Sequence, residues 1–339
     1  MDELKKIIVI GASAGGFDAI AQLISILPAG EGLAVFIVLH LSKNSNGNVI
    51  IQHIQQRTSL TCRVPEDREP ILSGHLYLAP PDHHMMVKQG SIRIHTGPKE
   101  NRWRPSIDVL FRSAAVAYDS HVIGIVLTGL MDDGTSGMSA IKRSGGICIV
   151  QEPSEALYPD MPTSVLNIVE VDYQVPIADM GYIIADNLSK PAKEFLPIPR
   201  EVKIEAEITE SMVSSIDRLK EIGKKSDFSC PDCGGILWKL NHDGTHRYRC
   251  YTGHAYTESV LNETQSKGLE ESLWVSIRML EERRNLLKLM SQHENEAGHA
   301  AQSIETQKRA EEAVVHIERL KLMLYSMDKN GGATVETKS

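Results

Sequence analysis

Short apolar runs alternate with helical patterns along residues 1–190, which we take as the first domain. The runs Val35–Leu39 and Val122–Leu127 are apolar on both faces, which is typical of parallel strands covered by helices on either side. The pattern predicts strands at Ile7–Ile10, Leu33–Leu39, His75–Ala79, Val122–Leu127 and Ile147–Val150. It predicts helices at Phe17–Leu27, Gly47–Arg57, Ser106–Tyr118, Gly137–Arg143 and Pro162–Ile168. We therefore expect a doubly wound α/β fold, with a mostly parallel sheet, helices on both faces and ligand chemistry at the strand carboxyl ends.

The rest of the chain divides into shorter segments by composition. A proline-rich stretch opens a linker at 191–227, which contains a polar helical segment around Ser211–Ile222. A compact cysteine-bearing module follows at 228–256. We expect a helical region at 257–328 and a disordered tail at 329–339.

Apolar residues in the helical region recur at spacings of three, four and seven. They are Leu273, Ile277, Leu280, Leu287, Ile317, Leu320 and Leu324. This periodicity predicts a C-terminal helical hairpin or a coiled coil. Two uses of the stripe remain open: it joins two copies in a homodimer or docks a partner, or it closes a hairpin within one chain.

Composition and charge narrow the classes of function. The formal net charge of -8 argues against a nucleic-acid partner, because such binding depends on clustered Lys and Arg that neutralise phosphates. No apolar run reaches the length of a membrane span, so we expect no direct membrane insertion. The N-terminus leads into the first strand without the layout of a signal peptide, which predicts a cytoplasmic protein.

The first strand-to-helix turn, Gly11–Gly16, places Ser13 between glycines where a helix begins. Glycine permits the sharp reversal of the backbone, and the free N–H groups of the next helix point back at the turn. A hydroxyl held there can attack a carbonyl while nearby amides receive the developing oxyanion. In the alternative interpretation, Ser13 only caps the helix.

Two other strand ends carry side chains that can activate this hydroxyl. His40 follows the second predicted strand, and Asp132 and Asp133 follow the fourth. The carboxyl ends of neighbouring parallel strands meet at one edge, so these residues and Ser13 are candidates for a Ser-His-Asp triad. The chain order differs from the Ser, Asp, His order of α/β-hydrolases, and the turn lacks the Gly-x-Gly-x-x-Gly of a dinucleotide site.

Several blocks of the sequence resemble the CheB-type chemotaxis protein-glutamate methylesterases. They are Ile10–Gly16, Val38–His40, Gly74–Pro80, Arg104–Phe111, Leu127–Gly134 and Met161–Pro162. These blocks occur in the order of that family and span most of the first domain. The resemblance is to a stand-alone catalytic domain, so we expect no receiver domain to cover the cleft.

The resemblance implies a role for each matching residue. Ser13 is the nucleophile, His40 the base and Asp133 the third member of the triad, and a backbone N–H near Leu130 helps to form the oxyanion hole. The family hydrolyses γ-glutamyl methyl esters on the cytoplasmic helices of chemoreceptors, some members deamidate glutamine there, and catalysis needs no cofactor. Met161 edges the cleft in the family, or it simply fills core space here. The competing hypothesis is a non-catalytic signalling scaffold that keeps the fold.

Two segments near the expected cleft have more than one interpretation. His40 is followed by Leu41 and Ser42, whereas the family usually continues with Met-Pro, so the substrate is less defined than the reaction. The segment Arg102–Arg104 precedes a predicted helix. It is either an electropositive rim for an acidic receptor helix or a solvated loop.

The late cysteines have the spacing of a metal site. Cys230 and Cys233 form a Cys-x-x-Cys knuckle, and Cys250 and His254 follow further along the chain. Three thiolates and one imidazole are a closed tetrahedral set that suits structural zinc.

The residues between these ligands predict a zinc-ribbon-like module. Ile236–Leu240 and Arg247–Arg249 alternate in the manner of two strands around a turn, so we expect a β-hairpin. His242 and His246 compete with His254 for the fourth ligand position.

Overall fold

The computed structural model describes residues 6–28, 32–191, 196–212, 215–240 and 244–331. His242 and residues 332–339 of the predicted tail lie outside these ranges. The chain divides into two compact units, Met1–Leu261 and Asn262–Ser339, and each is described by itself.

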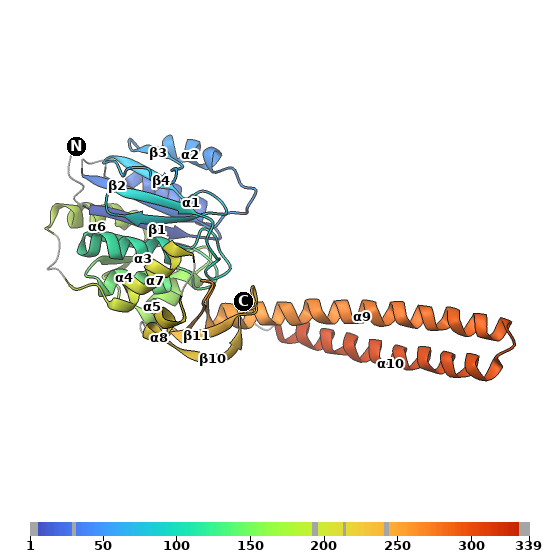
Figure 1. The fold of residues 1–339 in the computed structure, drawn as a ribbon. Coiled ribbons are helices and arrows are strands. Elements are labelled where there is room, and N and C mark those ends of the chain that lie inside the picture. Colours follow the sequence, from blue (N-terminus) through green and yellow to red (C-terminus); the bar gives the residue numbers. More distant parts are fainter. Residues whose placement is uncertain (1–5, 29–31, 192–195, 213–214, 241–243, 332–339) are drawn as a thin grey trace. The chain divides into compact units, whose positions relative to one another are not determined.

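A seven-stranded sheet forms the centre of the first unit (Figure 1). Its strands, in spatial order, are β3 (Thr61–Arg63), β4 (His75–Leu78), β2 (Leu33–Leu39), β1 (Lys6–Ala12), β7 (Val122–Val126), β8 (Ile147–Gln151) and β9 (Tyr173–Val175). Every neighbouring pair is parallel. This confirms the predicted α/β fold. The edge strands β3 and β9 were not predicted, because each has only three residues and neither is fully buried.

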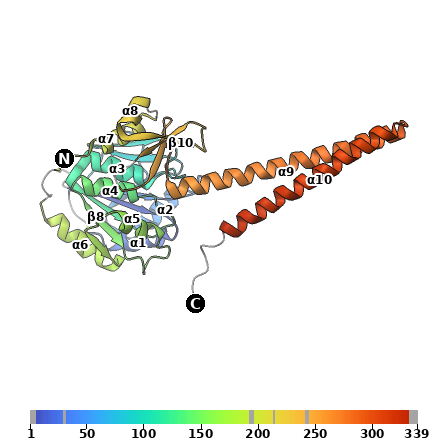
Figure 2. The ribbon, with the colours of Figure 1, turned by 90° about the horizontal axis from the view of Figure 1, so that it is seen from below.

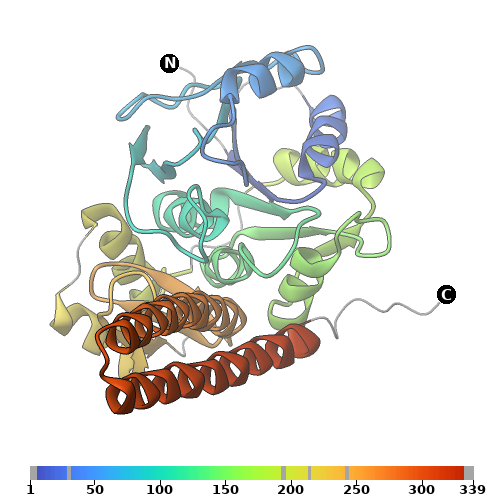
Figure 3. The same cartoon turned by 90° about the vertical axis from the view of Figure 1, so that its right-hand side faces the viewer.

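Helices cover both faces of this sheet. One face carries α1 (Gly16–Ile26), α2 (Gly47–Gln55) and α6 (Ile177–Ser189), and the other carries α3 (Ile107–Tyr118), α4 (Thr135–Arg143) and α5 (Asp160–Ile168). Side chains of β1 alternate between the two cores, with Ile8 and Ile10 on the first face and Ile7 and Val9 on the second. The helices α1 and α6 lie side by side (Figure 3). The helix α6 was not predicted from the sequence.

Further elements extend the α3 face. A hairpin of β5 (His84–Lys88) and β6 (Ser91–His95) contacts α3, and a short 3-10 helix, Asp119–His121, follows that helix. The segment expected as a linker contains α7 (Arg200–Ser211) and α8 (Ile216–Ile222), and α7 packs against α3. This segment therefore contributes to the folded unit instead of merely connecting two parts.

The cysteine-bearing module is a four-stranded antiparallel sheet. Its strands, in spatial and chain order, are β10 (Gly223–Ser229), β11 (Ile236–Leu240), β12 (Arg247–Cys250) and β13 (Ala255–Thr257). The strands β11 and β12 form the predicted hairpin. We call this sheet the ribbon. It belongs to the same compact unit as the seven-stranded sheet.

The second unit is a hairpin of two long helices, drawn in orange and red (Figure 2). The helix α9 (Glu258–Glu296) begins in the first unit, and α10 (Ala300–Gly331) follows a turn at Gly298, whose φ is 83°. The predicted apolar stripe forms the seam between the two helices, with Leu273 and Ile277 packed against Ile317. Among the described residues, no helix has both the length and the apolar character that crossing a membrane requires.

Candidate active site

Three loops meet at the carboxyl edge of the seven-stranded sheet, where the strand order reverses. Because β1 lies between β2 and β7, the loops after these three strands are neighbours. Ser13 follows β1, His40 follows β2, and Asp133 lies between β7 and α4. Backbone hydrogen bonds fix the first two, since the Ser13 N–H donates to the Thr128 carbonyl at 3.0 Å and the His40 N–H to the Ala12 carbonyl at 3.1 Å.

The side chains of the three residues form one hydrogen-bonded series. His40 Nδ1 lies 3.1 Å from Ser13 Oγ, and His40 Nε2 lies 2.8 Å from Asp133 Oδ2. The His40 and Asp133 side chains are 1% and 2% exposed. An imidazole placed between a hydroxyl and a carboxylate can take the hydroxyl proton. The structure thus brings together the three residues expected from the sequence, with Asp133 and not Asp132 against His40.

Ser13 is held in a narrow place and does not cap the helix after it. The N-cap of α1 is Gly15, with a φ of 69° and no side-chain hydrogen bond. Gly129, from the loop after β7, comes so close that a Cβ there would lie 2.8 Å from the Ser13 Cβ and 2.1 Å from Met161 Sδ. Met161 is fully buried. It therefore fills core space beneath the nucleophile loop, which is one of the two roles expected for it.

The Asp133 carboxylate accepts hydrogen bonds from several directions. Its donors are His40 Nε2, the Ile107 N–H at 2.7 Å, Ser106 Oγ at 2.9 Å, Asn101 Nδ2 at 3.0 Å and the Asp108 N–H at 3.4 Å. Two of these are the first amides of α3, whose positive end favours a negative charge. Burial raises the pKa of Asp133, but the hydrogen bonds, with that from His40 foremost, outweigh burial and lower the pKa below its usual range.

A second buried carboxylate, Asp108, lies behind the first. Asn101 Nδ2 is 3.0 Å from Asp108 Oδ2 and 3.0 Å from Asp133 Oδ1, so it bridges them. Asp108 Oδ1 accepts the Gly134 N–H at 3.0 Å and the Gly137 N–H at 2.7 Å, which fixes the loop that carries Asp133. Burial first, and repulsion by Asp133 second, raise the pKa of Asp108 well above its usual range. The negative charge of the pair is therefore concentrated beside His40.

Trp103 packs on the imidazole of His40. The two rings stack with centroids 4.1 Å apart and planes 11° apart. From the sequence, Trp103 was expected on an electropositive rim or a solvated loop. The neighbouring Arg104 binds the Asp82 carboxylate at 2.7 Å and two backbone carbonyls, so its charge is engaged within the loop.

The positions that support Asp133 were not predicted from the sequence. For Ser106 a signal existed, because a helix was predicted to begin there and a helix start directs free amides at a negative group. Asn101 and Trp103 lie in a stretch between β6 and α3 that has no periodicity. No local pattern relates that stretch to His40.

The backbone near Leu130 is the expected oxyanion site. Among the described residues, the Leu130 N–H has no internal acceptor, whereas the Gly129 N–H bonds to the Tyr158 carbonyl and the Met131 N–H to Asp160 Oδ2. An amide that is left without an acceptor beside a nucleophile can stabilise an oxyanion.

A second cluster gathers four metal-binding side chains in the ribbon. The ligand atoms of Cys230, Cys233, Cys250 and His254 all lie within 4.8 Å of one another. Cys233 Sγ is 3.7 Å from Cys250 Sγ, which is 3.6 Å from His254 Nδ1. We call these four residues the Cys/His group. Three thiols and an imidazole that converge in this way can hold a metal ion.

His254 takes the fourth position of this group within the described part of the chain. His246 is exposed and is not a member. Hydroxyl groups also contact the sulfurs: Thr252 Oγ1 lies 2.9 Å from Cys250 Sγ, and the Tyr256 hydroxyl lies 3.2 Å from Cys230 Sγ.

Comparisons with known proteins agree with the fold. A family model described as CheB methylesterase matches residues 8–184. The crystal structure of the Thermotoga maritima CheB methylesterase catalytic domain matches with a TM-score of 0.51 and 28% identity, over 54% of this chain and 98% of that one.

Several curated proteins are similar in sequence. A Leptospira interrogans protein is 37% identical over 49% of this chain and 86% of its own length. The Bordetella bronchiseptica and Salmonella typhimurium proteins named protein-glutamate methylesterase/protein-glutamine glutaminase are each 34% identical, over 54% and 52% of this chain. This chain spans about half of their length, 53% and 51%.

The parallel α/β fold and these matches define a carboxylic ester hydrolase. The chain belongs to the CheB methylesterase family, whose model matches residues up to 184 and so does not include the ribbon.

Proposed function

We propose that this chain hydrolyses γ-glutamyl methyl esters on chemoreceptor-like signalling proteins with Ser13, His40 and Asp133. The observation that carries the proposal is the hydrogen-bonded series of these side chains, at 3.1 and 2.8 Å, in a member of the CheB methylesterase family. The names of the similar proteins, which include both esterase and glutaminase, support the choice of substrate.

In the first half of the reaction, Ser13 Oγ attacks the ester carbonyl while His40 Nδ1 takes its proton. The ionised Asp133 stabilises the imidazolium that forms. The carbonyl oxygen becomes an oxyanion, which the N–H of Leu130 receives. When the C–O bond breaks, His40 returns the proton to the leaving methoxide, and methanol departs.

In the second half, water attacks the acyl-enzyme and His40 takes a proton from it. The bond to Ser13 breaks, Ser13 regains its proton, and the product is a glutamate carboxylate. The same steps applied to a glutamine side chain would release ammonia, which is the proposed side activity. Because chemoreceptor helices that carry such esters lie in the cytoplasm, the proposal places this chain there.

The test uses membranes whose chemoreceptors carry tritiated methyl esters, and it counts the released methanol. We expect Ser13→Ala to lower the rate at least about 10³-fold, because the nucleophile is lost while binding remains. Ser25→Ala, on the exposed side of α1, is the matched control and should keep the wild-type rate. Equal rates for wild type and Ser13→Ala, with both variants folded by circular dichroism, would favour the scaffold hypothesis instead.

We further propose that the Cys/His group holds a structural zinc ion. Zinc in a tetrahedron, at about 2.3 Å from sulfur and about 2.1 Å from nitrogen, separates two sulfurs by about 3.8 Å and sulfur from nitrogen by about 3.6 Å. The distances of 3.7 and 3.6 Å from Cys250 Sγ to Cys233 Sγ and His254 Nδ1 fit this geometry. The bound ion would join the two ends of the ribbon sheet, and it takes no part in the proposed reaction.

We also propose that the helical hairpin joins two copies of the chain. The seam within the hairpin leaves a second set of apolar side chains exposed, which includes Val275, Met279, Leu286 and Met290 on α9 and Val315, Leu322 and Tyr325 on α10. The spacings of four, seven and four on α9 keep these residues on one face. A second hairpin packed there would give a four-helix bundle.

A further inference from the structure

The strand β13 lies between the Cys/His group and the residues around Asp133. It begins directly after His254. The hydroxyl of Tyr256, its middle residue, lies 3.2 Å from Cys230 Sγ. The N–H of Thr257, the next residue, donates to Asn101 Oδ1 at 3.1 Å. The strand β13 thus contacts both the Cys230 thiol and the side chain of Asn101, which bridges Asp108 and Asp133.

The backbone of the Asn101 loop is also bound to this strand. The Asn101 N–H donates to the Ala255 carbonyl at 2.8 Å, and the Ala255 N–H to the Lys99 carbonyl at 3.4 Å. Asn101 has a left-handed backbone, with a φ of 50°, and the residue is 4% exposed. Asparagine tolerates this conformation better than most residues. The position and the orientation of the amide are therefore set by β13.

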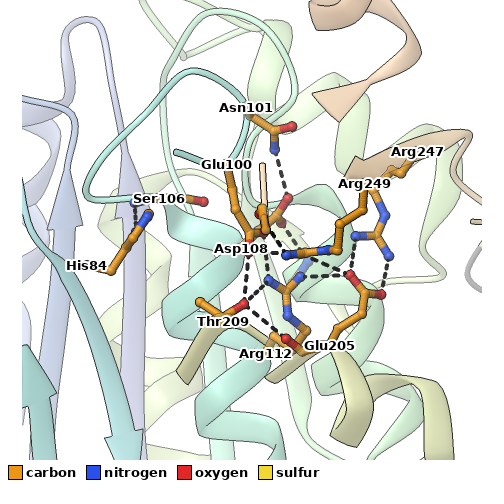
Figure 4. Close-up of polar contacts among 12 residues, drawn as sticks. His84, Glu100, Asn101, Ser106, Asp108, Arg112, Glu205, Thr209, Arg247 and Arg249 are labelled. Atoms are coloured by element: carbon orange, nitrogen blue, oxygen red, sulfur yellow. Dashed lines mark hydrogen bonds and ion pairs between the residues drawn. The ribbon is translucent and has the colours of Figure 1, made fainter. Parts of the chain in front are cut away.

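Buried charges fasten the ribbon to the catalytic face (Figure 4). Arg249, on β12, binds Glu100 Oε1 at 2.8 Å. Glu100 directly precedes Asn101 in the sequence. Glu100 also binds Arg112 of α3 at 2.6 Å. Arg247 forms two bonds to Glu205 of α7, at 2.8 and 2.7 Å. These five side chains, which we call the Arg/Glu cluster, are all nearly inaccessible to solvent.

We propose that the ribbon positions the carboxylate of Asp133 through Asn101. Asn101 is a positioning residue: its Oδ1 is held by the Thr257 N–H, and its Nδ2 then points at Asp133 Oδ1 at 3.0 Å. Asp133 in turn orients His40 toward Ser13. The integrity of the Cys/His group therefore controls the reactivity of Ser13. This inference rests on the proposed function of the triad.

The physical basis is the cost of leaving two buried carboxylates without a shared donor. When Asn101 Nδ2 is lost, Asp133 Oδ1 and Asp108 Oδ2 each lose a donor, and the buried charge beside His40 is less stabilised. Asp133 then turns or gains a proton, and either change weakens its bond to His40. A hydrogen bond to a charged group contributes enough that its loss should slow the reaction of Ser13 about tenfold or more.

The experiment measures the rate at which a fluorophosphonate probe labels Ser13, together with methanol release from tritiated receptors. Asn101→Gly removes both links and suits a left-handed backbone. Asn101→Asp keeps an acceptor for the Thr257 N–H but puts a carboxylate oxygen beside Asp133. Asp119→Gly, at the opposite end of α3 with a φ of 41°, makes a comparable substitution away from the site and is the control.

We expect both Asn101 variants to label at least about tenfold more slowly than wild type, while Asp119→Gly labels at the wild-type rate. Hydrogen exchange at the Thr257 amide should speed up in Asn101→Gly and stay slow in Asn101→Asp. The exchange measurement separates loss of the ribbon contact from loss of the donor to Asp133.

Removal of metal with a chelator tests the direction of the coupling. Chelation should slow the labelling of wild type about as much as Asn101→Gly does, and it should have little added effect in that variant. Unchanged labelling in both Asn101 variants, or equal added losses on chelation in wild type and Asn101→Gly, would overturn the inference. In those cases Ser13→Ala would still abolish labelling, whereas failure of the proposed function would leave wild type unlabelled from the start.

Discussion

At the scale of single residues, the site depends on one position that bears no functional group. Gly129 lets the loop after β7 pass against Ser13, because any larger residue would enter space that Ser13 and Met161 occupy. Polar contacts position Asp133 and His40, whereas the absence of a side chain at Gly129 leaves room for the turn that carries Ser13.

Gly129→Ala should therefore damage the activity more than the fold. The new Cβ would lie 2.1 Å from Met161 Sδ and 2.8 Å from the Ser13 Cβ, and relief of the second contact changes the distance between Ser13 and the loop after β7. We expect methanol release to fall about 10²-fold, since displacements of about 1 Å have that effect. Gly268→Ala, on α9, where nothing lies within 4 Å of the added carbon and φ is not positive, is the control for glycine loss. A wild-type rate in Gly129→Ala would contradict the assignment of this contact.

The sequence alone located Ser13, His40 and the pair Asp132–Asp133, because each follows a predicted buried strand and strand ends converge. The resemblance to the CheB-type family then singled out Asp133. The sequence could not locate Asn101 or Trp103. Their position depends on how a non-periodic stretch folds back between β6 and α3, and that path is set by contacts with Ala255 and Thr257, far away in sequence.

At the scale of elements, the ribbon is a small sheet that depends on its ligands. The core of the ribbon consists of a few side chains, and two of them are Cys230 and Cys250 themselves. So small a core stabilises little by burial alone, and a structural metal supplies the rest.

Elemental analysis of the purified chain should therefore find about one zinc ion per chain, lost in Cys230→Ser/Cys233→Ser. Cys62→Ser, which changes a cysteine outside the Cys/His group, should keep the zinc content. The double variant should also unfold at a lower urea concentration, because binding of the metal stabilises the folded state. A chain that is free of metal and yet equally stable would contradict the zinc proposal.

The exposed apolar face of the hairpin gives a second prediction for an element. Met279→Glu/Leu286→Glu places two charges on this face, and at concentrations where wild type is dimeric the variant should elute as a monomer with the same helix content. Light scattering after size exclusion measures the mass. Glu270→Gln/Glu281→Gln, on the same helix but away from this face, is a control that should leave the mass unchanged. A monomeric wild type would contradict the proposal that this exposed face joins two copies of the chain.

Two missed elements show where hydrophobic patterns fail as predictors. The helix α7 follows a proline-rich stretch and buries Glu205 and Thr209 as well as apolar residues. Polar residues mark a solvated surface in most sequences, so a helix that buries them against arginines has no recognisable apolar face. The strand β13 has only three residues, too few to display a period.

At the scale of the whole first unit, the Arg/Glu cluster links stability to pH. Burial alone would raise the pKa of Glu100, but Arg112 and Arg249 outweigh it and lower the pKa to about 2, from a usual value of 4.5. A carboxyl whose pKa is lower in the folded state stabilises that state above its unfolded pKa and loses this effect as the pH falls. The contribution of Glu100, on the order of 3 kcal/mol, should be lost between about pH 4.5 and pH 2.

Glu100→Gln should therefore be less stable than wild type at pH 7, by about 3 kcal/mol or more, because Arg112 and Arg249 lose their charged partner. The difference should shrink as the pH falls below 4.5, since wild type loses the same charge. Urea unfolding at a series of pH values measures both free energies. The exposed Glu66→Gln is the control, and a difference that stays constant with pH would contradict the assignment.

The Arg/Glu cluster has a consequence for folding during translation. Glu100 and Arg249 are 149 positions apart, so all three triad residues are synthesised well before Arg249. Until then Glu100 lacks one of its two arginine partners, and Asn101 lacks the hydrogen bonds to β13. We expect the N-terminal half of the nascent chain to be inactive toward esters until the C-terminal half has been translated.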